Sequence, residues 1–209
     1  MFDWLGDILS GLGDALSVVF EGVGADIAVD IWNALVEWID KEVLDAFSYR
    51  GLVYESADYH NAVFVGADRE GKPRHIHKHS TAAQGSFKGN APGSKPEYSF
   101  HWVGGGDNLF LFEAPIDMLS FISMHKQHWK SSSYAAACGV SDKVLWKTME
   151  GRQFIRNVCI CLDNDETGQK AAQRISKELT EKNIRNQILV PTRKDWNEDL
   201  LFLRKEDKK

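Results

Sequence analysis

Two short apolar segments of this chain end abruptly in carboxylates. Leu109–Phe112 is followed directly by Glu113, and Val158–Leu162 is followed by Asp163 and Asp165. Apolar runs of this length, bounded by polar residues, are typical of buried strands. Open α/β sheets bind ligands at the carboxyl ends of their parallel strands. The pattern therefore predicts an oxygen-only site that suits Mg²⁺ or Mn²⁺ and points to phosphate transfer or hydrolysis.

The C-terminal unit, residues 105–203, alternates between strand and helix patterns. We expect strands at 109–113, 134–138, 158–162 and 187–190, and helices that begin near residues 115, 141, 167 and 195. Strands separated by single helices imply a parallel sheet with helices on both faces. We therefore predict an α/β fold for this unit, followed by a charged tail at residues 204–209.

The middle segment, residues 49–104, predicts a small β-rich subdomain. Strand patterns fall at 49–55, 62–66 and 73–79, with a turn at 68–71 and an irregular stretch at 82–96. Gly104–Gly106 is expected to be a hinge to the next unit. His75, His77 and His79 alternate, so on a strand they share one face. We favour solvated or phosphate-facing histidines there, and a metal site is the alternative.

Basic residues gather around the same segment, and they suggest a nucleic-acid surface. Residues 50–209 hold twenty acidic and twenty-four basic residues, whereas residues 1–49 hold ten acidic residues and one base. Aromatic residues among the bases favour a surface for single-stranded nucleic acid, and a solvated basic face is the alternative. The bases around the predicted hairpin are Arg69, Lys72, Arg74, Lys78, Lys88 and Lys95.

The N-terminal segment, residues 1–48, predicts an amphipathic helical hairpin, with two helices around Gly22–Gly24. An acidic residue interrupts it every few positions, whereas a membrane-spanning helix needs about twenty mainly apolar residues. We therefore expect no transmembrane span. Packing of residues 1–47 on the body, or on a second copy in a homo-oligomer, is the favoured interpretation. Docking to a membrane or to a membrane complex is the alternative.

The three cysteines favour a reducing, cytoplasmic location. Cys159 and Cys161 alternate within a predicted buried strand, and no C-x-x-C pair occurs, so a zinc finger is not expected. The N-terminus lacks the basic region of a secretory signal.

The acidic segments also carry a family resemblance. Glu113 followed by Ala-Pro-Ile-Asp-Met-Leu-Ser, together with Leu162–Gly168 and Ala171-Ala172, resembles the toprim domain. Bacterial DNA primases, type IA and type II topoisomerases, certain nucleases and recombination proteins share this domain. The pattern is most similar to the bacterial primase branch. With residues 50–103 it resembles the toprim proteins carried on conjugative and other mobile elements.

This resemblance implies roles for individual residues. Glu113 would be a general acid/base or metal ligand, and Asp163 and Asp165 would be the metal-binding pair. Gly168 would let the following helix approach closely, and the candidates for phosphate contact are Lys170, Arg193 and Lys194. The alternative is that the three acids only cap helices and solvate loops.

Further acids lie near the three predicted ligands. Asp117 is interpreted as a solvated first-turn acid that suits the helix dipole, with support of the metal site as the alternative. Primase-like members place more acids after the fourth strand, where this chain has Asp195, Asn197 and Glu198. We do not expect the zinc module, the longer polymerase core or the helicase-binding region of primases in this sequence.

The start of the chain has a second resemblance. Met1–Gly6 and Ile31–Trp38 resemble the N-terminus of the integral membrane component of conjugative type IV secretion systems, over residues 1–45. The sequence thus predicts a Mg²⁺-dependent toprim protein that acts on nucleic-acid phosphodiesters, by primase-like nucleotidyl transfer or strand cleavage. Its partners would be DNA, single-stranded or not, or nucleotides. A non-catalytic nucleic-acid-binding module and an interaction protein docked to a transfer complex through residues 1–47 are the alternatives.

Overall fold

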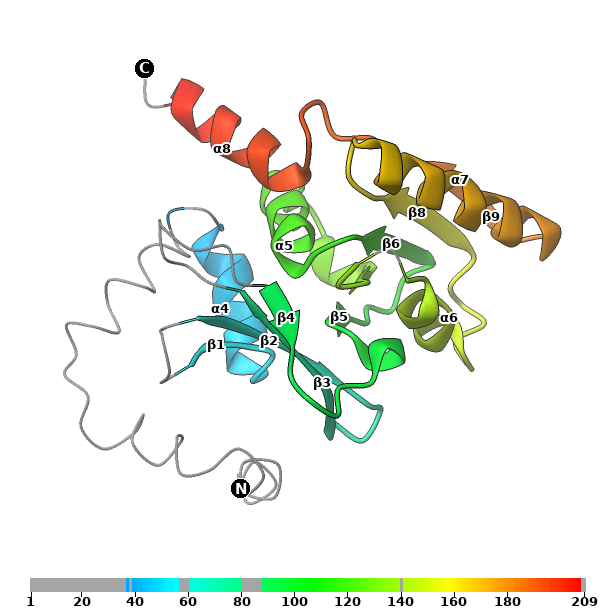
Figure 1. The fold of residues 1–209 in the computed structure, drawn as a ribbon, viewed down its shortest axis with the longest axis horizontal. Coiled ribbons are helices and arrows are strands. Elements are labelled where there is room, and N and C mark those ends of the chain that lie inside the picture. The colour runs from blue at the N-terminus through cyan, green and yellow to red at the C-terminus, as the bar shows by residue number, and fades with distance from the viewer. Residues whose placement is uncertain (1–36, 38, 57–60, 80–87, 140, 208–209) are drawn as a thin grey trace.

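The computed structural model describes residues 37, 39–56, 61–79, 88–139 and 141–207 (Figure 1). Residues 1–36 of the expected hairpin lie outside the described residues. Its last part is present as helix α4, Lys41–Tyr49. Asp40 caps this helix, because its carboxylate accepts a hydrogen bond from the Glu42 amide at 3.0 Å.

The middle segment forms an antiparallel sheet of four strands in the order β1-β2-β3-β4. Asp68 forms the turn between β2 and β3, since its carboxylate and carbonyl accept the amides of Lys72 and Gly71. Strand β4 lies in the stretch that was expected to be irregular, so that expectation was wrong there. The strands are β1 (Val53–Glu55), β2 (Ala62–Ala67), β3 (Pro73–His79) and β4 (Lys88–Asn90).

The second sheet has five strands in the order β5-β7-β6-β8-β9. Strands β7, β6, β8 and β9 run parallel, and β5 pairs antiparallel with β7. Residues assigned to the β-rich subdomain thus supply an edge strand to this sheet. The strands are β5 (His101–Trp102), β6 (Asn108–Phe112), β7 (Ser133–Ala136), β8 (Asn157–Cys161) and β9 (Arg185–Ile188).

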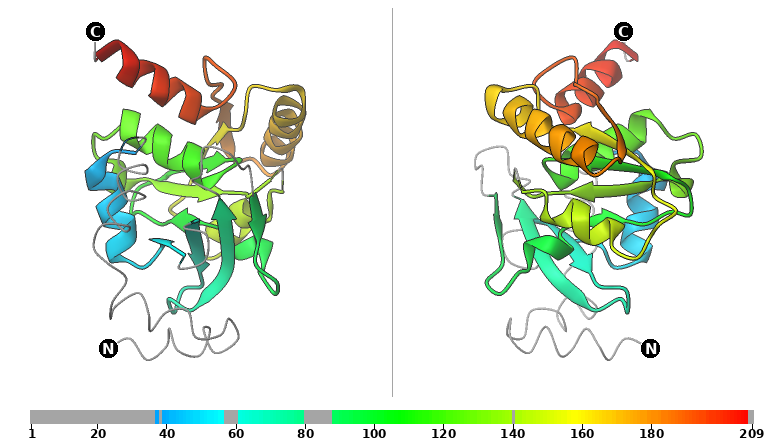
Figure 2. Two further views of the ribbon diagram at one scale, coloured as in Figure 1. Left: turned by 60° about the vertical axis from the view of Figure 1, so that its left-hand side comes forward. Right: turned by 90° about the vertical axis from the view of Figure 1, so that its right-hand side faces the viewer.

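Helices cover both faces of the five-stranded sheet, as the sequence predicted (Figure 2). On one face, Phe112 and Cys161 pack with residues of α4, α5 and α8. On the other face, Leu111 and Ile160 pack with residues of α6 and α7. The helices are α5 (Pro115–Met124), α6 (Lys143–Met149), α7 (Glu166–Glu181) and α8 (Trp196–Asp207), with short 3₁₀ turns η1 (Pro96–Tyr98) and η2 (Trp129–Ser131).

Helix α4 joins the two sheets through a cluster of aromatic rings. The Phe47 ring stacks on Trp129 at 5.7 Å and contacts Phe100 at 5.2 Å and Trp102 at 5.1 Å. Phe100 in turn meets Phe64 of β2 edge-on at 5.3 Å. All five rings are buried within one apolar core. Residues 39–47 therefore pack as part of the body.

Two glycines between β5 and β6, Gly104 and Gly106, are closely packed. A Cβ atom on Gly104 would lie 2.4 Å from the Ser131 carbonyl oxygen, and one on Gly106 would lie 2.8 Å from it. The Gly106 amide also donates to that oxygen at 2.7 Å. The expected hinge is thus a tight contact of two backbones, which only glycine permits.

The aromatic cluster predicts a large stability effect within α4. We expect Phe47→Ala to lower the free energy of unfolding by about 3 kcal/mol or more, because it removes a fully buried ring and leaves a cavity. Tyr49→Ala is the matched control, since Tyr49 lies in the same helix and is 94% exposed. Urea unfolding of both variants measures the difference. Equal losses would contradict this role of the cluster.

Candidate functional site

The parallel register brings two of the predicted acids to one edge of the five-stranded sheet. Phe112, the last residue of β6, lies beside Cys161, the last residue of β8. Glu113 follows the first strand directly, and Asp163 follows the second by two residues. Both acids thus leave the carboxyl edge of the sheet, where α/β proteins bind ligands.

The third acid, Asp165, starts helix α7. Its Oδ1 accepts the Gly168 amide at 2.8 Å, which leaves Oδ2 for a cation. A Cβ atom on Gly168 would lie 2.4 Å from the Asp163 carbonyl oxygen. The prediction that Gly168 lets the helix approach the loop closely is therefore confirmed.

The loop between β9 and α8 completes this edge. The Asn164 amide donates to the Lys194 carbonyl at 2.7 Å. Asp199 holds the loop from α8, because its two carboxylate oxygens accept the amides of Thr192 and Arg193 at 2.7 and 2.9 Å. Asp195 in turn accepts the Glu198 amide at 2.8 Å. The loop that precedes Asp195 thus lies directly against the loop of Asp163 and Asp165.

Two carboxylate oxygens at this edge are buried without a hydrogen-bond donor, namely Asp163 Oδ1 and Glu113 Oε2. Burial, together with the charges of Glu113, Asp195 and Asp165, raises the pKa of Asp163 to about 7. Burial and the charge of Asp165 also raise the pKa of Glu113. Unpaired buried carboxylates that repel one another are costly unless a cation offsets the repulsion.

The structure shows that a fourth acid, Asp117, belongs to this cluster. Asp117 is only 6% exposed and accepts the Asn197 amide at 3.2 Å. Burial, followed by the charges of Asp163 and Asp195, raises its pKa to about 8. The interpretation of Asp117 as a solvated first-turn acid was wrong, because α8 covers this turn of α5. The sequence signal for the place of Asp117 in this cluster was its position one helical turn after Glu113.

The donor set suits a hard divalent cation, since it consists of carboxylate oxygens, two of which lack any other partner. In the part of the chain that the structure describes, no three acidic, histidine or cysteine side chains already converge on one point as a preformed metal site.

The predicted basic residues lie on two different faces of the small sheet. Lys88 lies directly opposite His79 and so shares the face of the alternating histidines. Its charge lowers the pKa of both Glu113 and Asp117, against the larger effect of burial. Arg74 and Lys78 occupy the alternate positions of β3 and point to the opposite face. Of the three lysine and arginine residues on β3 and β4, only Lys88 thus lies on the face of the histidines.

The remaining basic candidates differ in what they contact. Lys194 faces the site, since its charge lowers the pKa of Glu113 and Asp163. Arg69 donates to the Glu150 carbonyl at the end of α6. Lys170 pairs with Glu166 at 2.5 Å. Arg193 lies 3.6 Å from the centre of the Phe202 ring and 3.5 Å from Asp199, and Arg74 pairs with Asp68 at 2.6 Å.

The alternating histidines are more buried than expected. His75 and His77 are 1% and 7% exposed, and His77 Nδ1 lies 2.8 Å from Asn90 Oδ1. Burial and the nearby Lys88 charge lower the pKa of His79 to about 4. The expectation of solvated histidines was therefore wrong for His75 and His77, whereas a phosphate-facing role stays a prediction.

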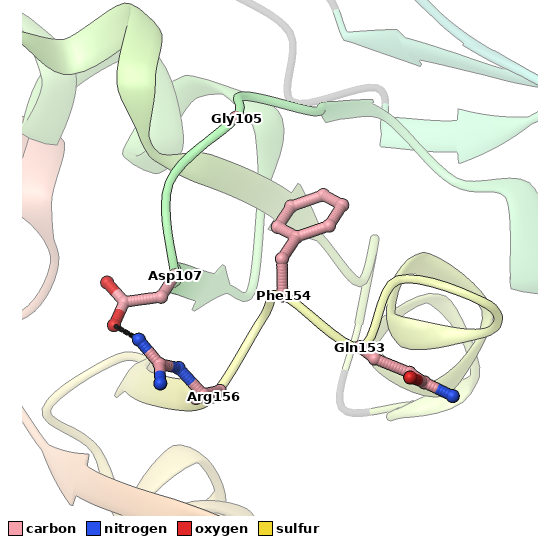
Figure 3. A pocket seen from close by; sticks show the side chains of 5 residues that line it. All are labelled: Gly105, Asp107, Gln153, Phe154 and Arg156. Carbon is pink, nitrogen blue, oxygen red and sulfur yellow. Dashed lines mark hydrogen bonds and ion pairs between the residues drawn. The ribbon is translucent and has the colours of Figure 1, made fainter.

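A surface hollow lies at the other end of the five-stranded sheet (Figure 3). Asp107 precedes β6 and Arg156 precedes β8, and the two form an ion pair at 3.2 Å. The hollow is also lined by Gly105, Gln153 and Phe154. It thus lies at the amino ends of the strands, opposite the clustered acids.

Two family models match consecutive parts of the chain. Residues 36–106 match a family described as a protein of unknown function (DUF3991), and residues 110–200 match the family described as Toprim-like. Residues 110–200 have the toprim fold. The predicted fold class, a parallel sheet with helices on both faces preceded by a small β sheet, is confirmed for the described residues.

Solved primase structures share this fold. The primase fragment of the bacteriophage T7 primase-helicase is 18% identical, with a TM-score of 0.59 over 81% of this chain and 68% of that one. The Aquifex aeolicus primase, with its zinc-binding and RNA polymerase domains, is 13% identical, with a TM-score of 0.60 over 98% of this chain and 58% of that one. Identities this low establish similarity of fold.

A sequence relative comes from Bacillus anthracis. The uncharacterized protein pXO2-78 is 29% identical over 157 residues, which is 69% of this chain. The chain covers 45% of that relative's length.

In the described part of the chain, no helix is long and apolar enough to span a membrane.

The raised pKa of Asp163 predicts pH-dependent stability of the toprim domain without divalent cations. Between about pH 4 and about pH 7, the folded protein keeps a proton that the unfolded chain loses. Stability therefore falls as pH rises through this window. We expect Asp163→Asn to raise the urea midpoint at pH 8, with the gain shrinking toward pH 5, in EDTA.

The matched control for this experiment is Glu166→Gln, which alters an exposed carboxylate in the same segment. Glu166→Gln should give no increase in the urea midpoint that grows with pH. A gain for Asp163→Asn that is equal at pH 5 and pH 8 would contradict charge repulsion as its cause.

Proposed function

We propose that this protein is a Mg²⁺-dependent toprim protein that acts on nucleic-acid phosphodiesters, by primase-like nucleotidyl transfer or strand cleavage. The observation that carries the proposal is the pair of buried, unpartnered carboxylate oxygens of Glu113 and Asp163 at the carboxyl edge of the sheet. Buried acids with raised pKa values in such a place are typical of functional sites. The primase folds described above support the choice of nucleic acid as substrate.

Each acid has a separate role in this proposal. Asp163 and Asp165 would hold Mg²⁺, or Mn²⁺ in its place, from the loop that leads into α7. Glu113 completes the metal site or moves a proton at the reacting oxygen, which its raised pKa favours. The bound cation would offset charge on a phosphate and stabilise the charge that develops during transfer. Asp117 supports these residues by fixing the first turn of α8 through the Asn197 amide.

Two lysines from opposite sides of the site provide the phosphate contacts. Lys88 comes from the small sheet and Lys194 from the loop before α8, and the charges of both act on Glu113. A phosphate next to the acids would thus meet positive charge from both parts of the molecule. Of the other predicted contacts, Arg69, Arg74, Lys78, Lys170 and Arg193 would serve at most more distant parts of a nucleic acid.

A non-catalytic nucleic-acid-binding module is the second candidate. It is favoured by the absence, among the described residues, of three ligands that already converge on one point.

We further propose a role in replication or transfer of mobile-element DNA, which rests on the resemblance of residues 50–203 to toprim proteins of such elements. The cysteines in the core of the sheet favour the cytoplasm. The secretion-component resemblance of residues 1–45, and the docking of residues 1–47 to a transfer complex, stay predictions.

Calorimetric titration with Mn²⁺ tests the metal site directly. We expect Asp163→Asn and Asp165→Asn each to weaken Mn²⁺ binding at least about tenfold, because each removes one ionised oxygen ligand. Glu166→Gln is the control, since it removes an exposed acid one residue after Asp165. If Mn²⁺ binds the folded Asp163→Asn and Asp165→Asn proteins as it binds wild type, the assignment of these ligands is wrong.

A pair of lysine variants tests the proposed phosphate contacts. We expect Lys88→Ala to weaken binding of a single-stranded DNA oligonucleotide in the presence of Mn²⁺. The slope of log affinity against log salt concentration should become shallower by about one, because one phosphate contact is lost. Lys78→Ala should have a smaller effect. Lys78 lies on β3, the strand next to Lys88, and points to the face away from the acids. Fluorescence anisotropy over a salt series measures both. Equal effects would contradict binding on the face of Lys88.

A further inference from the structure

The turn that follows α6 carries an exposed aromatic ring between two arginines. The turn begins at Arg152, whose carbonyl oxygen accepts the Ile155 amide at 3.0 Å. It includes Phe154, which is 42% exposed. The Asp107 carbonyl oxygen accepts the Arg156 amide at 2.9 Å and so anchors the far end of the turn. The backbone here is thus held in place at the amino ends of β6 and β8, opposite the clustered acids.

Another arginine, from the small sheet, lies against this turn. Arg69 lies between β2 and β3 and donates to the Glu150 carbonyl. A Cβ atom on Gly151 would lie 2.8 Å from the Arg69 guanidinium. Arg152 donates to the Thr148 carbonyl at 2.6 Å. Burial, followed by the charge of Arg69, lowers the pKa of Arg152. Two guanidinium groups from different parts of the chain therefore lie close together and repel each other.

Neither of these two guanidinium groups forms an ion pair with a carboxylate among the described residues. The charge of Glu150 acts on Arg152, but its carboxylate pairs with Lys147 at 2.5 Å. Like charges in contact are costly unless an ion of opposite charge offsets the repulsion. The pair therefore favours binding of an anion.

The surroundings of the pair are also positive when every neighbouring acid is counted. Residues 68–74, 95–98, 107 and 147–156 hold seven basic and five acidic residues, which leaves a net charge of +2. Three of the acids are already paired with bases, namely Asp68 with Arg74, Asp107 with Arg156 and Glu150 with Lys147. The unpaired positive charge thus includes Arg69 and Arg152.

The exposed ring of this turn lines the surface hollow of Figure 3, which has a volume of about 530 Å³. Sites for small ligands have volumes of about 300–1,000 Å³. Figure 3 shows the Phe154 ring projecting toward the loop of Gly105, whereas Gln153 points away from that loop. A Cβ atom on Gly105 would meet no other atom within 4 Å. One face of an aromatic ring is therefore accessible next to the arginine pair.

We propose that this turn and Arg69 form a second contact surface for single-stranded nucleic acid, in which Arg69 and Arg152 hold a phosphate and Phe154 stacks on an unpaired base. Guanidinium groups bind phosphate through parallel N–H···O bonds. Exposed aromatic rings beside basic residues stack on the bases of single strands. The choice of nucleic acid rests on the proposed function, whereas the surface itself does not depend on the metal site.

Fluorescence anisotropy with a single-stranded DNA oligonucleotide in EDTA tests the stacking contact without a bound metal. We expect Phe154→Ala to weaken binding about fivefold or more, because one stacked base is lost. Binding of a DNA duplex of the same length should not change, since its bases are paired. Tyr49→Ala is the matched control, because it removes an exposed aromatic ring from α4.

Arginine variants test the phosphate contact in the same assay. We expect Arg69→Ala and Arg152→Ala each to make the slope of log affinity against log salt concentration shallower by about one. Lys177→Ala should leave the slope unchanged, because it removes an exposed base of α7. Gly105→Leu should weaken single-strand binding without altering any charge, since the new side chain would fill the hollow. Urea unfolding shows whether each variant is folded.

Two kinds of result would overturn this inference, and they are distinguishable. If folded Phe154→Ala and Gly105→Leu proteins bind single strands as wild type does, or if Phe154→Ala weakens duplex binding equally, base stacking in the hollow is wrong. The proposed function survives that result if Lys88→Ala still weakens binding in the presence of Mn²⁺. If wild type binds no single-stranded DNA with or without Mn²⁺, both proposals fail.

Discussion

The ring contacts of Phe47 hold the small sheet and the toprim domain in a fixed relation. Phe47 contacts Phe100 and Trp129, and Phe100 contacts Phe64 in the centre of the small sheet. Because this core is continuous, the small sheet that carries β4 and the five-stranded sheet pack as one body. The effect of Lys88 on Glu113 depends on this arrangement, since the two residues belong to different sheets. The aromatic core thus contributes to the position from which the charge of Lys88 acts on Glu113.

The acidic edge opposes the stability that this core provides. Four acids, Glu113, Asp163, Asp165 and Asp195, each raise the pKa of at least one other acid at this edge, and the pKa of Asp117 is raised by two of them. The fold offsets the repulsion only in part, with the charges of two lysines and with the first amides of α7 and α8. Natural sequences depart from local consistency in this way mainly at functional sites. The departure is therefore a physical argument for binding at this edge, independent of any family resemblance.

The strands that carry the acids could be predicted from the sequence because their signal is local. Apolar runs before Glu113 and Asp163 indicate buried strands whatever surrounds them, and glycine at position 168 indicates close helix packing. The choice between Lys88 and Lys78 could not be made, because it depends on β4, a strand without a recognisable pattern. Asp117 was misjudged for a similar reason, since the helix that buries it lies 80 residues later in the chain.

One hydrogen bond joins the start of α8 to the strand that leads to the acids. The Trp196 indole donates to the carbonyl oxygen of Cys161 at 2.9 Å, in a buried position. Cys161 ends β8, two residues before Asp163. The first turn of α8 therefore bonds the ends of two elements at the site, Cys161 of β8 through Trp196 and Asp117 of α5 through the Asn197 amide. A displacement of this turn would move the backbone before Asp163 and the Asp117 carboxylate together.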